Sequence, residues 1–161
     1  MVRIASGYDI DRIMEIYALA RDYMRKTGNP TQWSDDYPGV ELIESDIDKQ
    51  RSYVLYDDAG IYGVFYFEIG ADPTYSYIEG GAWIDDNEAY GVIHRIASDG
   101  THRRILDETV QYCEGIIHNL RIDTHNDNKI MQAAICRNGF KKCGIIYLPD
   151  GDPRIAYQKI I

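Results

Sequence analysis

The order of periodic segments in the sequence predicts an α+β fold, with a mixed central sheet of about seven strands flanked by about four helices. Three observations lead to this prediction: apolar residues at helical spacing near the start, two β-rich segments around a short turn, and a strand–helix–strand succession in the second half. A chain of 161 residues is long enough for one domain with its own core. We therefore expect residues 1–161 to form a single domain.

The first fifty residues predict one short strand and two helices. Val2–Ala5 is expected as a strand, and Ser6–Asp9 resembles a helix-opening box because a carboxylate stands at its fourth position. Glycine and proline in Gly28–Pro30 stop the helix that follows, and a shorter helix is expected from Glu41 to Gln50. The apolar residues that recur at helical spacing in the first helix are Ile10, Ile13, Met14, Tyr17, Ala20 and Met24.

Two segments rich in β-branched and aromatic residues come next. Ser52–Tyr56 and Ile61–Ile69 are separated by Asp57-Asp58-Ala59-Gly60, which is typical of a hairpin turn, so the two strands should be antiparallel neighbours. The stretch from Gly70 to Glu88 mixes turn residues with aromatic ones. We expect it to be an extended excursion between strands.

The second half predicts a parallel strand pair. Tyr90–Ala97 and Leu120–Thr124 are expected as strands, and the helix between them implies a right-handed crossover that makes them parallel. The inward face of that helix is expected to consist of Leu106, Val110, Cys113 and Ile117.

The chain should close with a helix and a hairpin. Asn126–Asn138 is expected as the last helix, with Gly139 as its stop and Phe140–Leu148 and Arg154–Ile160 as the final two strands. The residues expected to point inward from this helix are Ile130, Met131, Ala134 and Ile135.

Charge and cysteine content exclude some classes of function. A net charge of -9 opposes binding to nucleic acid, whose affinity depends on Lys and Arg neutralising phosphates; it would suit a cationic ligand, although many acidic proteins are acidic for solubility. The three cysteines match neither a disulfide framework nor a zinc cluster, which favours a reducing compartment. Because neither a signal-peptide pattern nor a long apolar run is seen, we expect a cytoplasmic protein with no membrane and no nucleic-acid partner.

Local motifs resemble those of one superfamily. Asn128–Phe140 is similar to the Asn-x-x-Ala-x-x-Leu-Tyr-x-x-x-Gly-Phe signature of the GNAT (Gcn5-related N-acetyltransferase) superfamily, and it follows a predicted strand, as that family requires. Tyr90–Ser98 resembles the GNAT strand that pairs with pantetheine. Ile93–Ser98 and Phe140–Tyr147 resemble a bacterial subgroup of unassigned substrate. The resemblance extends from Arg3 to Lys159.

The resemblance implies an N-acetyltransferase that moves an acetyl group from the cosubstrate acetyl-CoA to a primary amine of a small molecule or peptide, by direct attack in a ternary complex and without a metal. It also implies that backbone groups in the predicted strand bind pantetheine, that the start of the next helix binds the pyrophosphate, and that Asn128 contacts the CoA arm. The residues implied in the first two roles are Ile96, Ala97 and Ser98, and then Arg103, Arg104, Ile105 and Leu106.

Two departures from the family pattern keep an alternative open. The family places Gln/Arg-x-x-Gly-x-Gly/Ala at the pyrophosphate, whereas here the small positions hold Arg104 and Leu106, which could crowd the phosphates; Arg103 and Arg104 could instead pair with them. Ile135 stands where many members carry the tyrosine that protonates the CoA thiolate. The alternative is a catalytically silent acyl-CoA-binding or interaction module. A nucleotide-dependent enzyme is disfavoured because the glycine-rich phosphate motifs are missing.

Residues for proton transfer and acceptor binding are less specific. His94 and His125 are candidate proton acceptors, because imidazole titrates near neutral pH, and either could instead be structural. Tyr147 is the nearest substitute for the missing acid. Trp33 and Tyr75 lie in segments that could cover the acceptor, and Trp33 could hold an amine by cation–π contact or simply pack. A homodimer is left open.

Overall fold

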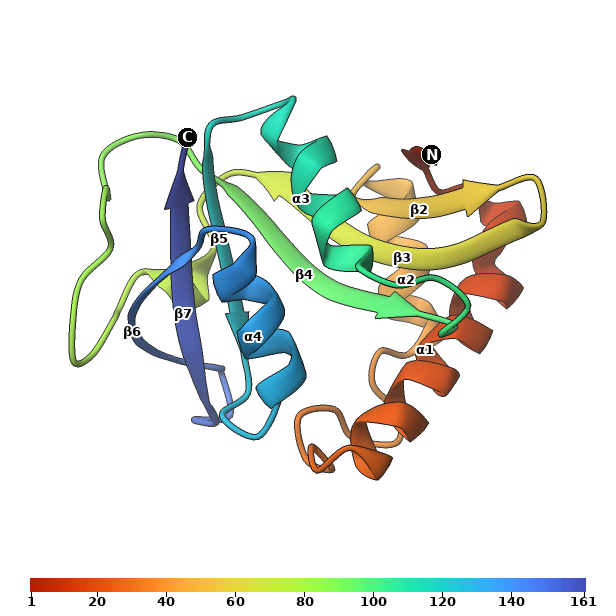
Figure 1. Cartoon of the computed structure of the whole chain (residues 1–161), viewed down its shortest axis with the longest axis horizontal. Coiled ribbons are helices and arrows are strands. Elements are labelled where there is room, and N and C mark those ends of the chain that lie inside the picture. The colour runs from red at the N-terminus through yellow and green to blue at the C-terminus, as the bar shows by residue number, and fades with distance from the viewer. The chain divides into compact units, whose positions relative to one another are not determined.

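The computed structural model describes residues 1–161 and confirms the predicted α+β fold, with seven strands in one mixed sheet and four α-helices (Figure 1). The strand order is β1-β2-β3-β4-β5-β7-β6. The strands are β1 (Val2–Ile4), β2 (Ser52–Asp57), β3 (Gly60–Ile69), β4 (Gly91–Ser98), β5 (Asn119–Thr124), β6 (Lys141–Tyr147) and β7 (Pro153–Ile160). The α-helices are α1 (Ile10–Lys26), α2 (Val40–Asp48), α3 (Ile105–Glu114) and α4 (Lys129–Arg137), and short 3-10 turns cover Gly7–Asp9 and Pro73–Tyr75.

The chain forms two compact units. Residues 1–67 and 94–105 make up the first unit, and residues 68–93 and 106–161 make up the second. The division passes through β4 and through the start of α3. Each unit has a core of its own. The single domain expected from the sequence stays a prediction.

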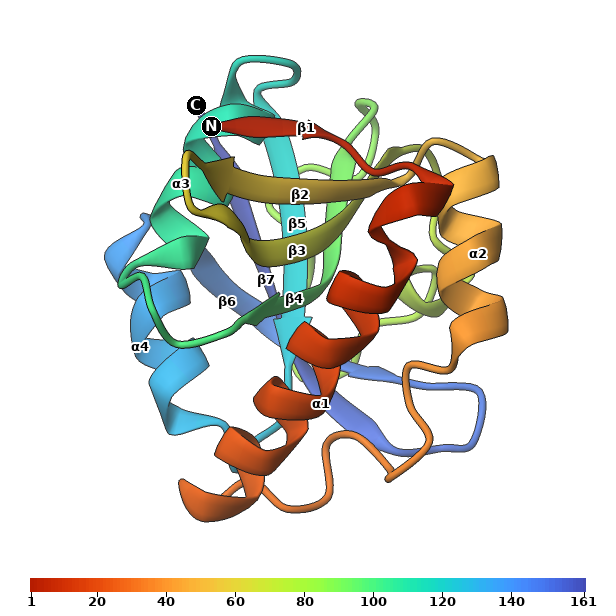
Figure 2. The ribbon, with the colours of Figure 1, turned by 90° about the vertical axis from the view of Figure 1, so that its right-hand side faces the viewer.

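The first unit is built on an antiparallel arrangement of β1, β2 and β3. Arg3 pairs with Val54, and Tyr53 pairs with Phe65, so the predicted hairpin of β2 and β3 is confirmed. Figure 2 shows α1 in front of one end of these strands, with α2 beside it. The buried residues that form the core here are Ala5, Ile13, Ile16, Tyr17, Ala20, Ile43, Val54, Val64 and Ala97.

The predicted opening of α1 is present and includes an ion pair. The Asp9 carboxylate accepts a hydrogen bond from the Ser6 backbone N–H at 2.8 Å, and it accepts two from the Arg3 guanidinium at 2.8 and 2.9 Å. The hydrogen bond from Arg3, together with those from Ser6, outweighs the effect of burial and lowers the pKa of Asp9 to about 2. The carboxylate thereby fixes the entry to the helix.

The second unit is built on β5, β7 and β6. β7 is antiparallel to both of its neighbours, and β4 is parallel to β5 over Gly91–Ile93, as the predicted crossover requires. In Figure 1, α4 is drawn in front of β5, with β7 to the side of both. The expected excursion from Gly70 to Glu88 is confirmed as an irregular segment, and a bridge from Glu79 to Ile145 attaches it to β6. Buried members of this core are Tyr75, Trp83, Val92, Cys143, Ile146 and Ala156.

Two details of the predicted helices are wrong. α3 ends at Glu114, so Ile117 lies beyond it, because Gly115 follows and the chain turns there with its N–H bonded to the Tyr112 carbonyl. α4 begins at Lys129 rather than at Asn126, and Ile130 is 51% exposed.

The exposure of Ile130 follows from helix geometry. Ile135 is fully buried and marks the inward face of α4. Ile130 is five positions before Ile135. At about 100° per residue, the side chain of Ile130 is therefore rotated by about 140° from the inward face.

Candidate functional site

The strand β4 changes conformation at Arg95. Its parallel ladder with β5 ends at Ile93, paired with Ile122, and Arg95 has φ 48°, a value that non-glycine residues rarely adopt. Such backbone strain persists only where the surroundings enforce it, and it concentrates at functional sites. The irregularity immediately precedes Ile96–Ser98, the residues expected at pantetheine.

The side chain and carbonyl of Arg95 are both held. Its guanidinium donates to the Asp46 carboxylate at 2.6 Å and lies over the Tyr66 ring, 4.5 Å from the centroid. The Tyr17 hydroxyl donates to the Arg95 carbonyl at 2.9 Å. Burial alone would lower the pKa of Arg95, but Tyr37 and Asp46 outweigh it and raise that pKa. The guanidinium therefore stays charged.

Sequence reasoning missed this cluster, although one signal was available. An arginine within a strand that is otherwise largely apolar needs a carboxylate partner, because a buried unpaired charge is very costly. The side chains of Arg95 and Asp46 are only 12% and 8% exposed. The sequence does not indicate which of its many carboxylates is the partner.

Ala97 and Ser98 end the strand in different environments. Ala97 is 5% exposed and belongs to the core of the first unit. The Ser98 hydroxyl accepts a hydrogen bond from the Gly100 N–H at 3.0 Å and so starts the following loop. If this stretch binds an extended ligand, it does so through backbone groups rather than through the Ala97 side chain.

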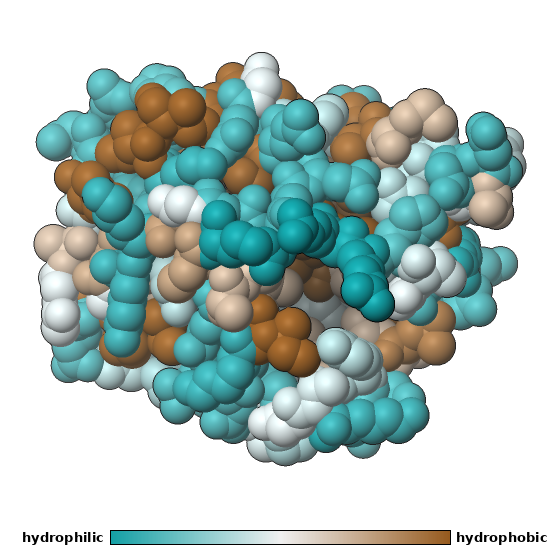
Figure 3. Space-filling view, viewed as in Figure 1, coloured by the Kyte–Doolittle hydropathy of each residue, from teal (hydrophilic) through white to brown (hydrophobic).

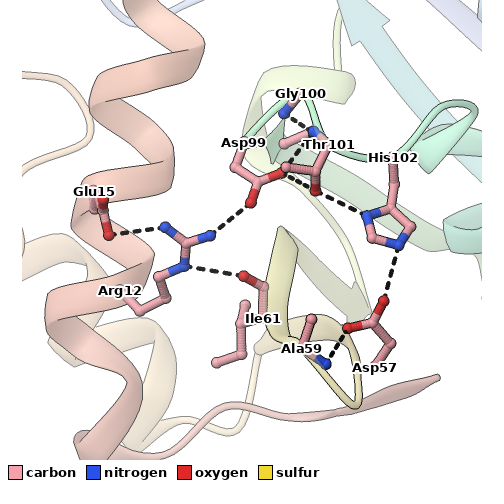
Figure 4. A network of polar contacts seen from close by, with 10 residues as sticks. Arg12, Glu15, Asp57, Ala59, Ile61, Asp99, Gly100, Thr101 and His102 are labelled. Carbon is pink, nitrogen blue, oxygen red and sulfur yellow. Dashed lines mark hydrogen bonds and ion pairs between the residues drawn. The ribbon is translucent and has the colours of Figure 1, made fainter.

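A polar network holds the loop that follows β4 (Figure 4). Arg12 on α1 donates to the Asp99 carboxylate at 2.6 Å and to the Ile61 carbonyl at 3.0 Å. Thr101 donates its hydroxyl and its N–H to Asp99 at 2.6 and 2.9 Å. His102 lies 3.0 Å from Asp57 at the end of β2. The sequence did not predict any of these contacts.

The residues expected at the pyrophosphate divide into exposed and buried pairs. Arg103 and Arg104 are exposed, whereas Ile105 and Leu106 are 8% and 4% exposed. Leu106 therefore points inward and does not crowd the exposed side of the loop. Arg104 has φ 61°, the left-handed conformation that glycine adopts without strain, which explains why a glycine suits this position.

The three candidate catalytic residues lie in different surroundings. His94 is in the first unit, with its ring centroid 5.7 Å from that of Tyr66. In the second unit, His125 follows the end of β5 and its Nδ1 accepts from the Asp127 N–H at 3.0 Å, so its neutral form carries the proton on Nε2. Tyr147 ends β6.

The strand register brings His125 and Tyr147 to the same end of the second unit. Thr124 pairs with Ile155 and Tyr147 pairs with Pro153, so β7 lies between the two candidates. The Tyr147 hydroxyl donates to the Glu79 carboxylate, and this hydrogen bond raises the pKa of Tyr147. Tyr147 therefore keeps its proton near neutral pH.

Asn128 and Ile135 both serve α4 structurally. The Asn128 side-chain oxygen accepts from the Met131 N–H at 3.1 Å and caps the helix. Ile135 has no exposed surface and cannot donate a proton.

Trp33 and Tyr75, the candidates for acceptor binding, are both packed among aromatic side chains. Trp33 makes edge contacts with Tyr17 and Tyr37, at centroid distances of 5.8 and 5.9 Å. Tyr75 is 2% exposed, contacts Trp83, and donates its hydroxyl to Asp123 at 2.7 Å. Trp33 is the more accessible of the two candidates.

No group of three or more His, Cys, Asp or Glu side chains is placed to hold a metal ion, and no helix combines the length and apolarity needed to cross a bilayer. On the face shown in Figure 3, hydrophilic residues predominate and apolar ones are scattered among them.

Comparison with solved structures identifies the family. The chain is similar to a GNAT-family acetyltransferase from Streptococcus agalactiae, with 32% identity, a TM-score of 0.90, and coverage of 100% of this chain and 95% of that one. A GNAT-family acetyltransferase from Listeria monocytogenes is 21% identical, with a TM-score of 0.73 and coverage of 100% and 94%, and shares the fold. Scans against family models and against curated proteins found no match. The chain belongs to the GNAT family of acetyltransferases.

Proposed function

We propose that this GNAT acetyltransferase transfers the acetyl group of acetyl-CoA to the primary amine of a small molecule or peptide, by direct attack within a ternary complex. The observation that carries the proposal is the form of β4: its ladder with β5 ends at Ile93, and the strand continues through the strained Arg95 to Ser98. A strand that extends past its ladder keeps main-chain groups for another extended partner. The amide-bearing pantetheine arm is such a partner.

The loop after β4 would bind the phosphates. Arg103 and Arg104 are exposed there, and charged forks of this kind pair well with phosphate oxygens. The network of Arg12, Asp99 and Thr101 holds the loop in place before any ligand arrives.

The reaction needs few protein groups. The neutral amine nitrogen attacks the thioester carbon, the tetrahedral oxyanion collapses, and the C–S bond breaks to leave the amide and the CoA thiolate. His94 or His125 would accept the proton lost by the amine. A thiol has a free pKa of about 8.5, so its thiolate can leave without the tyrosine that Ile135 replaces. Tyr147 holds a proton that it could supply.

A thiol-release assay tests this function. Acetyl-CoA is offered with a panel of polyamines, amino acids, aminoglycosides and short peptides, and each acceptor is compared with acetyl-CoA alone. We expect release that depends on at least one amine. In parallel, CoA should raise the melting temperature, because a ligand at one hundred times its Kd adds about 2.7 kcal/mol to stability.

The alternative is a catalytically silent acyl-CoA-binding module. It is favoured because Ile135 stands where many family members carry the tyrosine that protonates the CoA thiolate. It predicts a melting shift with CoA and no thiol release with any amine. If CoA causes no melting shift and no amine causes thiol release, both functions are contradicted.

A further inference from the structure

Tyr17 on α1 contacts the backbone of Arg95, and this contact is separate from the ion pair that holds the arginine side chain. The Tyr17 hydroxyl donates to the Arg95 carbonyl at 2.9 Å, whereas the guanidinium donates to Asp46. Burial raises the pKa of Tyr17, so the hydroxyl keeps its proton and acts as a donor. The strained residue of β4 is therefore bonded to a buried side chain that lies 78 residues earlier in the chain.

The geometry of the peptide bond extends the effect of this contact to Ile96. The Arg95 C=O and the Ile96 N–H belong to one planar trans peptide group, in which they point in opposite directions. Because the carbonyl is directed at the Tyr17 hydroxyl, the Ile96 N–H is directed away from it. Rotation of this peptide group would turn the carbonyl and the N–H together. Tyr17 therefore sets the direction of a backbone donor at the start of Ile96–Ser98.

The other end of Ile96–Ser98 is fixed as well. The Asp99 N–H donates to the Tyr62 carbonyl of β3 at 3.0 Å, and the Asp99 carboxylate accepts from Arg12 at 2.6 Å. Arg12 and Tyr17 both lie on α1. One helix thus holds this segment at both ends, through the carbonyl that precedes it and the carboxylate that follows it.

We infer that Tyr17 is a positioning residue for acyl-CoA, because its hydroxyl orients the Arg95–Ile96 peptide so that the Ile96 N–H faces the bound cosubstrate. The inference rests on the proposed function, in which the backbone of Ile96–Ser98 binds pantetheine. The pantetheine arm bears amide carbonyls, which accept hydrogen bonds from such a donor. A donor that is oriented before the ligand arrives lowers the ordering cost of binding. Tyr17 is 1% exposed, so it affects the ligand through the peptide and not by contact.

Tyr37 provides a matched control. Tyr17 and Tyr37 both pack edge-on against Trp33, at centroid distances of 5.8 and 5.9 Å. The hydroxyls of both also meet Arg95, but that of Tyr37 accepts from the guanidinium at 3.4 Å. Tyr17→Phe and Tyr37→Phe each remove one hydroxyl and keep the ring beside Trp33. Only Tyr17→Phe removes a hydrogen bond to the peptide that precedes the segment.

Residual dipolar couplings test the orientation without any ligand, because they report the direction of each N–H bond in solution. In Tyr17→Phe we expect the coupling of the Ile96 N–H to change, while those of β2 and β3 stay as in wild type and show that the fold is intact. In Tyr37→Phe the Ile96 coupling should stay unchanged. An unchanged Ile96 coupling in folded Tyr17→Phe overturns the inference.

Calorimetric titration with CoA tests the consequence for the cosubstrate. Tyr17→Phe should weaken CoA about three- to tenfold, as expected for the loss of one neutral hydrogen bond, and Tyr37→Phe should change the Kd by less than about twofold. Unfolded protein would lower the fitted number of sites and leave the Kd unchanged, which separates a merely destabilising effect from a positioning effect. The KM for acetyl-CoA should rise by the same factor in Tyr17→Phe, with the KM for the amine unchanged.

Equal weakening of CoA in both variants, or no weakening in Tyr17→Phe, overturns the inference. The failure of the proposed function would look different. If wild type does not bind CoA while the Ile96 coupling still changes in Tyr17→Phe, the proposed function fails together with the cosubstrate role of Tyr17, and only the orientation of the peptide by Tyr17 stands.

Discussion

The guanidinium of Arg95 and the carboxylate of Asp46 form an ion pair at 2.6 Å that joins the strained turn of β4 to α2. Both side chains are largely buried. The Tyr17 hydroxyl holds the carbonyl of the same arginine from α1. The local conformation before Ile96–Ser98 therefore depends on two helices that are distant in sequence.

Breaking this pair should be strongly destabilising. Asp46→Ala leaves a buried guanidinium without its carboxylate, so we expect a loss of about 3 kcal/mol in the free energy of unfolding, measured by urea denaturation. Asp22→Ala, which removes an exposed pair with Lys26, should cost less than about 0.5 kcal/mol. The double variant Arg95→Met/Asp46→Leu should be more stable than Asp46→Ala. Equal losses in Asp46→Ala and Asp22→Ala would contradict the role of the pair.

Glycine at position 104 should stabilise the protein. Arg104 has φ 61°, which costs a non-glycine residue about 1 kcal/mol. Arg104→Gly should therefore raise the melting temperature by about 2 °C in calorimetry. Arg103→Gly is the control, because Arg103 has no positive φ and its replacement should only add chain entropy to the unfolded state. A lower melting temperature for Arg104→Gly would show that the side chain stabilises the loop more than the strain costs.

Variants of Arg104 also test how the protein binds CoA. If Arg104 pairs with the phosphates, Arg104→Ala and Arg104→Gly should both weaken CoA roughly ten- to a hundredfold in calorimetric titration, since charged hydrogen bonds contribute about 1.5–3 kcal/mol. The loss should shrink at high salt. If the side chain instead obstructs the loop, the glycine variant should bind CoA more tightly than wild type.

Asp9 should make stability depend on pH in the acid range. Its pKa falls from the usual 3.8 to about 2 on folding, chiefly through Arg3, so the folded state binds this proton less readily. The resulting stability, about 2 kcal/mol, is present above pH 3.8 and is lost as pH falls toward 2. Asp9→Asn should thus be less stable than wild type at pH 7, and the difference should shrink as the pH falls toward 2. A constant difference across this range would exclude the titration of Asp9 as its cause.

The three cysteines should differ in reactivity. Cys136 is exposed, whereas Cys113 and Cys143 are buried, and burial raises the pKa of both buried thiols. In native protein, Ellman's reagent should titrate one thiol rapidly, and Cys136→Ser should abolish this phase. In denaturant all three should react. Rapid reaction of Cys113 in native protein would show that α3 opens readily.

The order and type of the main elements could be predicted from the sequence, because apolar period and turn chemistry are local properties. The spacing of Ile13 and Tyr17 is enough to orient α1, and the Asp57–Gly60 turn is enough to pair β2 with β3. The GNAT signature could also be recognised from the sequence, because it lies in one continuous segment, Asn128–Phe140. Errors arose at helix ends, where Gly115 and the Asn128 cap decide the boundary.

The polar partners within the site were decided only by the tertiary structure. Arg95 finds Asp46 and His102 finds Asp57 across separations of 49 and 45 residues, and no sequence period selects one carboxylate among 26 acidic residues. Tyr75 was expected in a segment that could cover the acceptor, whereas packing buries its side chain; Leu106 is buried as its place on the predicted inward helix face requires. Burial and hydrogen-bond pairing depend on which surfaces meet when the chain folds, so they are properties of long-range contacts rather than of local pattern.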